Sequence, residues 1–221
     1  MDRFGLIGYP IGGSLSPKLF AVAYGGKYRY DLLECSDFEA GWRFFLQEGY
    51  TAVNITAPFK AHAAGRCDWS SDFVKRCGAA NIAVKTPDGI YADNSDVLAL
   101  RELLKGSGSV TVIGGGGAGR AAFVAAESLG LTPMLLHHDE IAHRKIEADA
   151  IVFTLPRAVD GLHNLHCNTL IEANYKTPCC QGTTNAGHYI GGKEWLKLQA
   201  ILGYGIMTGE APDKAGIMGA I

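Results

Sequence analysis

Residues 109–119 read SVTVIGGGGAG, and this stretch decides how the second half of the chain folds. The β-branched run before the glycines predicts a strand, and the alanine-rich residues 120–129 predict a helix that ends at Gly130. The spacing between them is G-x-G-x-x-G, which lets a pyrophosphate reach backbone N–H groups at the positive end of a helix. A bare glycine-rich turn is the alternative. We therefore expect a dinucleotide site at Gly114, Gly116, Gly117, Ala118 and Gly119.

The residues after this turn continue the alternation of strand and helix. We expect a strand over 131–138, a helix over 140–148 and a strand over 150–154. Such alternation is typical of a parallel sheet with crossover helices. The segment 140–148 has only nine residues, whereas a whole crossover normally takes at least about 10–12. The pattern predicts a shortened Rossmann-like domain.

The first half of the chain also alternates. Strands are expected over 3–9, 28–33 and 50–55, and helices from Ser16-Pro17, over 38–48, over 60–65 and over 97–105. Residues 80–85 and 90–92 flank Thr86-Pro87-Asp88-Gly89, whose turn chemistry predicts a hairpin. The fold class is therefore α/β in two halves, with a boundary near Gly106.

Composition excludes several classes of protein. Of 221 residues, 48% are hydrophobic and 19% are charged, which suits a packed core rather than a disordered chain. The net charge of −2 and the absence of long basic runs predict no nucleic-acid partner. No apolar run reaches the roughly 18 residues of a membrane span, and no signal peptide is visible. Six cysteines without CxxC or metal-ligand spacing predict reduced thiols, a cytoplasmic protein and no metal.

The end of the expected strand 131–138 bears on the choice of cofactor. Asp139 lies 20 residues after Gly119, where an acidic residue would hold the adenosine ribose diol and favour NAD. His137 and His138 precede it, and two histidines could instead hydrogen-bond a 2′-phosphate. We take His138 and Asp139 as cofactor-binding candidates and leave NADP and NAD both open.

Two polar clusters in the first half are candidates for catalysis. Lys60 starts a predicted helix, where the dipole disfavours a cation, so it is not placed there for helix stability and suits an acid/base role. Asp96 belongs to the cluster Asp93-Asn94-Ser95-Asp96 before an apolar helix, where a helix cap is the alternative reading.

At these residues the chain resembles the shikimate dehydrogenase family. Residues 14–17 are similar to the family motif S-x-S-P, residues 54–60 to N-V-T-x-P-x-K, and residues 78–81 to G-A-x-N. Residues 94–96 are similar to N-T-D with serine for threonine, and residues 114–121 to G-A-G-G-A-x-R-A. Residues 192–199 and 208–209 are similar to the closing motifs G-x-x-M-L-x-x-Q and T-G. The motifs occur in the family's order across nearly the whole chain.

The resemblance implies a substrate domain over 1–104, a Rossmann-like NAD(P) domain over 105–199 and a cleft between them. A C-terminal helix at about 200–221 would pack back on the first domain. The resemblance also implies reversible, NADP-linked reduction of 3-dehydroshikimate to shikimate, a step of chorismate and aromatic amino-acid biosynthesis. Lys60 and Asp96 would be the catalytic pair, in a monomer or homodimer. The residues that would surround the substrate are Ser14, Ser16, Thr56, Asn81, Tyr175 and Gln199.

The sequence departs from the family at four places. Gly13 replaces a histidine, Phe20-Ala21 replace His-Asn, residues 137–139 replace Asn-Arg-Thr, and residues 153–156 read Phe-Thr-Leu-Pro instead of Asn-Ala-Thr-Pro. Two alternatives follow from these changes: a dehydrogenase for quinate or another hydroxy acid that uses NAD, and a non-catalytic shikimate-binding homologue. The sequence His163-x-x-His166-Cys167 could be read as metal ligands, but no second cluster completes a tetrahedral set.

Overall fold

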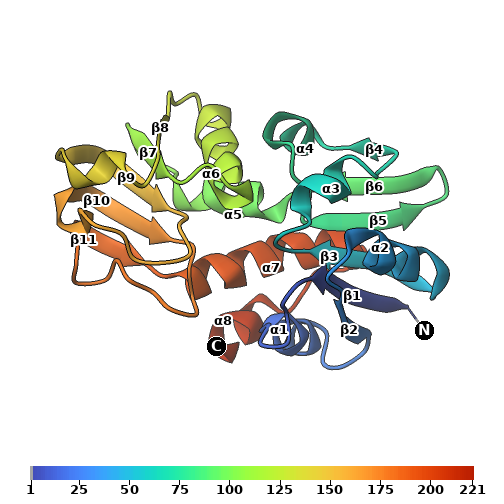
Figure 1. Ribbon diagram of the computed structural model, residues 1–221. Helices are drawn as coiled ribbons and strands as arrows, with labels where there is room; N and C mark the ends of the chain where they lie inside the picture. The colour runs from blue at the N-terminus through green and yellow to red at the C-terminus, as the bar shows by residue number, and fades with distance from the viewer. Residues whose placement is uncertain (1) are drawn as a thin grey trace. The chain divides into compact units, whose positions relative to one another are not determined.

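The computed structural model describes residues 2–221 and divides into two compact units. The first unit holds the chain up to Ser95 together with Lys197–Ile221, and the second holds Asp96–Leu196. Each unit contains one β-sheet with helices packed on it, as the sequence predicts (Figure 1). No helix among residues 2–221 combines the length and apolar character needed to cross a membrane.

The sheet of the first unit is mixed and has the strand order β2-β1-β3-β5-β6-β4. Strands β2, β1 and β3 run parallel to one another, β5 runs antiparallel to β3, and β5 and β6 form a hairpin. The bounds are β1 Arg3–Gly8, β2 Arg29–Glu34, β3 Tyr50–Ile55, β4 Trp69–Ser70, β5 Ile82–Thr86 and β6 Gly89–Asp93. Strands β1 and β3 are buried over most of their length, because both faces of a central parallel strand are covered.

The helices of the first unit begin at residues suited to that position. They are α1 Ser16–Ala23, α2 Phe38–Gln47, α3 Lys60–Ala64, α4 Asp72–Cys77, α8 Lys214–Ala220 and the part of α7 (Gly192–Thr208) from Lys197 onward. Asp37 caps α2 by accepting a hydrogen bond from the Ala40 N–H at 2.9 Å. Ser71 caps α4, and Gly78 ends that helix in the left-handed conformation at φ +60°. A single C-terminal helix was expected, but the chain turns after Thr208, and α8 then lies beside α1 (Figure 1).

Two apolar layers hold the first sheet in place. One layer lies under α2 and includes Trp42, Phe45 and Tyr50. The other is an aromatic cluster centred on Phe20, which is fully buried in α1. The rings of Phe4, Tyr24, Tyr28, Tyr30 and Tyr204 lie 4.6–6.4 Å from it, centroid to centroid. Thus the phenylalanine that replaces the family's histidine packs in an aromatic core.

The sheet of the second unit is entirely parallel, with the order β11-β10-β9-β7-β8. Its elements are α5 Ser95–Leu103, whose first residue belongs to the first unit, β7 Val110–Ile113, α6 Gly117–Ser128, β8 Met134–Leu136, the 3₁₀ turn η1 Glu140–Ala142, β9 Ile146–Phe153, the 3₁₀ turn η2 Leu162–Asn164, β10 Leu165–Glu172 and β11 Asn185–Ile190. The prediction of a shortened Rossmann-like fold is confirmed.

The helix expected over 140–148 is wrong. The structure has one 3₁₀ turn there, and strand β9 already begins at Ile146, so the residues before the strand are too few for a longer helix. The side-chain amide of Asn164 donates hydrogen bonds to the carbonyls of Ile141 and Ala142, so η2 holds η1 in place. The two turns lie close together, since a Cβ at Gly161, just before η2, would lie 2.4 Å from the carbonyl oxygen of Ile141 in η1.

The aromatic cluster gives a first prediction. Phe20→Ala should lower the free energy of unfolding of the first unit by about 3–5 kcal/mol, because it leaves a cavity among five rings. Denaturant titration followed by circular dichroism measures the change. Phe44→Ala is the matched control, since that ring is 46% exposed and should cost far less. Equal losses in the two variants would contradict a core role for Phe20.

Candidate active site

The serine segment lies between β1 and α1. The Ser14 N–H donates to the Ile11 carbonyl at 2.8 Å, and the Ser14 hydroxyl accepts from the Ser16 N–H at 3.2 Å. Ser16 is buried and Ser14 is half-buried. Ser16 was expected to cap α1, but Leu15 occupies the cap position and the Ser14 hydroxyl satisfies an N–H of the first turn instead. The two serines are thus neighbours at the start of one helix.

The segment with Thr56 and Lys60 follows the end of β3. The Thr56 N–H donates to the Ile7 carbonyl at 2.9 Å, which continues the β1–β3 pairing beyond the strand. Lys60 is the first residue of α3, as expected, and its side chain is half-buried. Its carbonyl accepts a hydrogen bond from the Ala80 N–H at 2.8 Å. The lysine backbone is therefore held against the segment that carries Asn81.

A buried polar network joins Asn81 to Gln199 through Ser95. The Asn81 Oδ1 accepts from the Ser95 N–H at 2.8 Å, and its Nδ2 donates to the Ser95 hydroxyl at 3.0 Å. The Ser95 hydroxyl donates to Gln199 Oε1 at 2.9 Å. Ser95 is fully buried and Asn81 is 3% exposed. Three motifs that are far apart in sequence thus meet at one hydroxyl.

Asn54 in β3 and Tyr30 in β2 extend this network to two strands of the sheet. The Tyr30 hydroxyl donates to Asn54 Oδ1 at 2.8 Å, and Asn54 Nδ2 donates to the Asn81 carbonyl at 3.2 Å. Burial raises the pKa of Tyr30 well above its usual value, so the phenol stays a neutral donor. Asn54 and Ser95 lie within motifs recognised in the sequence, but neither was selected as a site residue. The signal that could have identified Asn54 is a polar residue near the end of an apolar strand, and for Ser95 it is a polar residue at the start of the next helix.

The C-terminal helix α7 also reaches the serine segment. The Tyr204 hydroxyl donates to the Ser16 carbonyl at 3.2 Å, and Tyr204 is 1% exposed. Gln199 lies on the same helix and is half-buried. A Cβ at Gly203 would lie 2.8 Å from the Ser95 hydroxyl oxygen, so this glycine allows the helix to approach closely.

In the second unit, the glycine loop joins β7 to α6. Gly114 has φ +101°, and a Cβ on Gly119 would lie only 1.8 Å from the Gly114 carbonyl oxygen. No side chain caps the helix at Gly116, which is exposed and where a Cβ would meet no atom within 4 Å. The first backbone N–H groups of a twelve-residue helix therefore face accessible space. Phosphate groups bind well in such a place.

The end of β8 lies beside this loop. The Gly114 N–H donates to the Leu136 carbonyl at 2.9 Å, and a Cβ on Gly115 would be 3.9 Å from His137 Cε1. His137, His138 and Asp139 are all exposed. His137, which was not among the selected cofactor residues, is the one next to the loop. The Glu140 carboxylate accepts from the His137 N–H at 2.7 Å and fixes the turn.

Tyr175 and Asp96 are the other selected residues of the second unit. Tyr175 is half-buried in the loop after β10, and burial raises its pKa. The Asn174 side chain beside it bonds to Pro156 and Thr177, which orders that loop. Asp96 is 8% exposed in the first turn of α5. Lys60 and Asp96 thus belong to different units of the chain.

Comparisons with known proteins show which family the chain resembles. Residues 6–83 match the shikimate dehydrogenase substrate binding domain. The shikimate dehydrogenase (NADP(+)) of Chromohalobacter salexigens is 34% identical over 148 residues, which cover 62% of this chain and 54% of that protein. The corresponding protein of Halobacterium salinarum is 36% identical over 160 residues, covering 67% of this chain and 60% of that protein. The chain belongs to the shikimate dehydrogenase family.

Solved structures agree with this fold. The Thermus thermophilus shikimate 5-dehydrogenase, solved in complex with shikimate, superposes with a TM-score of 0.83 at 23% identity, over 100% of this chain and 97% of that one. A shikimate 5-dehydrogenase from Mycobacterium fortuitum gives a TM-score of 0.77 at 26% identity, over 99% and 97%. The sequence matches are shorter, since they span little more than half the length of the curated relatives. The match over residues 6–83 includes Ser14, Lys60 and Asn81, whereas Asp96, Gln199 and the glycine loop lie beyond it.

The network around Ser95 gives a second prediction. Ser95→Ala should lower the free energy of unfolding of the first unit by about 1–3 kcal/mol, because it leaves the Asn81 amide and Gln199 Oε1 without their shared partner. Thermal and denaturant unfolding measure the loss. Ser36→Ala, at an exposed serine, should change stability by less than about 0.5 kcal/mol. A Ser95→Ala variant as stable as the parent would show that the network contributes nothing.

Proposed function

We propose that this chain is an NADP-linked shikimate dehydrogenase that reduces 3-dehydroshikimate to shikimate reversibly. The observation that carries the proposal is the network in which Ser95 joins Asn81 to Gln199, because it gathers separate family motifs around one buried hydroxyl. A polyhydroxylated acid needs several directed donors and acceptors, and such groups converge in the first unit. We propose that this unit binds the substrate, in line with the expected domain 1–104 and the returning C-terminal segment.

In this proposal Lys60 exchanges the proton of the reacting hydroxyl. Alcohol oxidation needs a base within hydrogen-bond reach of that hydroxyl, and ketone reduction needs the same group as an acid. Asp96 would hold the substrate and orient Lys60. Ser14, Ser16 and Thr56 would bind the carboxylate, while Asn81, Tyr175 and Gln199 would bind hydroxyls or close the site. The hydrogen bond from the Ser16 N–H to the Ser14 hydroxyl, which holds the two serines together, supports the first of these assignments.

The second unit fits a nucleotide in its glycine loop. The cofactor, when bound, would supply the hydride to the carbonyl carbon as NADPH and would take it up in the reverse direction as NADP(+). The uncapped start of α6 and the absence of any Cβ at Gly116 leave room for a pyrophosphate. His138 or its neighbour His137 would donate to a 2′-phosphate. The NADP(+) relatives and the Thermus thermophilus structure in complex with NADP(H) and shikimate support this choice.

We further propose that the protein is cytoplasmic and acts as a monomer or homodimer. Within residues 2–221 the six cysteines form no disulfide, which suits a reducing compartment. Sedimentation of the purified protein measures the number of chains.

One assay tests the activity. The absorbance of the reduced nicotinamide is followed with shikimate or quinate, using NADP and NAD in turn, and the highest kcat/KM is expected with shikimate and NADP. Faster turnover with NAD would point to Asp139 as a ribose ligand and would overturn the cofactor assignment. Shikimate binding without turnover for any pair would overturn the enzyme assignment in favour of a binding protein.

The role of Lys60 gives a third prediction. Lys60→Ala should lower kcat by roughly 10²–10⁴-fold, because a positioned acid/base is lost, while shikimate affinity stays within about tenfold. Steady-state kinetics and calorimetry measure the two quantities. Lys75→Ala, at an exposed lysine of α4, is the matched control and should leave both unchanged. A Lys60→Ala variant with near-normal kcat would remove Lys60 from the mechanism.

The glycine loop gives a fourth prediction. Gly119→Ala should weaken NADP binding by at least about tenfold, or ~1.4 kcal/mol, since the new methyl group must push the Gly114 carbonyl out of the loop. Fluorescence titration with NADPH measures the affinity. Gly219→Ala, where a Cβ meets no atom within 4 Å, controls for the substitution itself. Unchanged affinity for Gly119→Ala would argue against a nucleotide on this loop.

A further inference from the structure

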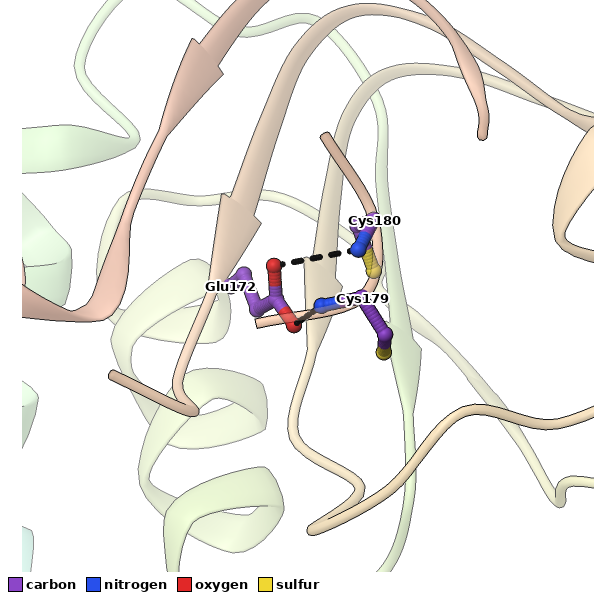
Figure 2. A group of neighbouring side chains, drawn as sticks. All are labelled: Glu172, Cys179 and Cys180. Carbon is purple, nitrogen blue, oxygen red and sulfur yellow. Dashed lines mark hydrogen bonds between the residues drawn. The ribbon is translucent and has the colours of Figure 1, made fainter. Parts of the chain in front are cut away.

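Glu172 is a fully buried carboxylate at the end of β10 in the second unit. Its Oε1 accepts from the Cys179 N–H at 2.7 Å (Figure 2). Its Oε2 accepts from the Cys180 N–H at 3.2 Å and from the Tyr189 hydroxyl at 2.6 Å. Within residues 2–221 these neutral donors are its partners, and no ion pair balances its charge. An ionised carboxylate in such a place is costly unless a cation accompanies it.

The thiols of Cys179 and Cys180 lie next to this carboxylate. One ligand atom from each of the three residues falls within 4.8 Å of the other two. In a tetrahedral zinc site the ligand atoms are roughly 3.5–3.8 Å apart, as follows from bond lengths of about 2.0–2.3 Å. The three ligand atoms are thus up to about 1 Å farther apart than in a zinc site, and a rotation of the half-buried Cys179 side chain can bring its sulfur closer. Cys180 is fully buried, so only Cys179 leaves a path from solvent.

We propose that Glu172, Cys179 and Cys180 form a site for one thiophilic divalent cation such as Zn²⁺. Two sulfurs and one carboxylate oxygen are a ligand set that zinc accepts, and water can take a fourth position on the side of Cys179. The backbone N–H bonds to both carboxylate oxygens orient the glutamate in advance. On binding, the cation displaces the two thiol protons to solvent and gives Glu172 the positive partner that the protein does not provide.

A redox role suits the same cysteines less well. Burial raises the pKa of Cys179 to about 11, and the buried Cys180 is shifted further in the same direction. Peroxide oxidation starts from a thiolate, so these thiols are poor substrates for it. Metal binding also releases both thiol protons, so the affinity for the cation should rise with pH. The three residues are not those of the nucleotide loop, so the metal titration is read without reference to the proposed dehydrogenase activity.

The experiment is a metal titration of the full chain, purified with a chelator and a phosphine reductant. Calorimetry with ZnCl₂ should give one ion per chain. CdCl₂ should give a thiolate-to-cadmium charge-transfer absorption in the ultraviolet, which a merely structural cluster would not produce. Cys179→Ser should remove the contribution of one of the two thiolates from this absorption. It should also weaken zinc binding by more than about tenfold, since loss of a direct ligand costs at least as much as loss of a residue that only orients a ligand.

Two further variants make the result decisive. Cys35→Ser, at a half-buried thiol of the first unit, is the matched control and should bind both metals like the parent. Glu172→Gln keeps a hydrogen-bond acceptor for the loop, so it should fold and still lose at least tenfold in zinc affinity. The proposal is overturned if no stoichiometric metal binds. It is equally overturned if the cadmium absorption is unchanged in Cys179→Ser or is reduced in Cys35→Ser.

Discussion

The Ser95 hydroxyl oxygen is where the first unit is held together. It accepts a hydrogen bond from Asn81 and donates one to Gln199, so a strand end, the start of α5 and the returning helix α7 share a single buried atom. Gly203 lets α7 come this close, since any side chain there would collide with the serine. Apolar contacts alone allow such elements to slide, but directed bonds from a buried hydroxyl fix their register. The C-terminal segment is therefore locked to a strand that precedes it by more than a hundred residues.

The same constraint extends to other candidate substrate residues, which are also held by hydrogen bonds within the first unit. Asn54 bonds to the Asn81 carbonyl and receives the Tyr30 hydroxyl, and Tyr204 bonds to the Ser16 carbonyl. The two phenol donors, Tyr30 and Tyr204, belong to the aromatic layer around Phe20. Because buried polar groups need partners, the layer fixes the polar side chains that it surrounds. Preorganisation of this kind lowers the entropy cost of binding a small acid.

The sequence could predict a feature when the residues that specify it are neighbours in the chain, and could not when they come from distant elements. The hairpin at residues 86–89 and the glycine loop after β7 followed from turn chemistry, since a turn is specified by its own residues. The helix over 140–148 was wrong because a 3₁₀ turn and an early β9 divide that segment, and the bonds from Asn164 that stabilise the turn come from another element. The link from Ser95 to Gln199 joins residues far apart and has no periodicity to reveal it. The cluster at Glu172 was missed for a related reason: adjacent cysteines do not show a metal-ligand spacing, and the carboxylate lies seven residues earlier.

The second unit replaces helices with specific polar contacts. After β8 and β9 the chain returns through 3₁₀ turns, and after β10 it returns through the loop that carries Cys179 and Cys180. A helix would satisfy its own backbone and cover the sheet with an apolar face, whereas a short connection needs partners for its N–H groups. The Asn164 side-chain amide donates to two carbonyls of one turn, and the two oxygens of Glu172 accept from two consecutive N–H groups of the loop. A carboxylate serves this purpose better than a neutral amide because each of its oxygens is a strong acceptor. It also brings a negative charge into the core, so shortening the domain and creating a place for a cation have the same physical origin.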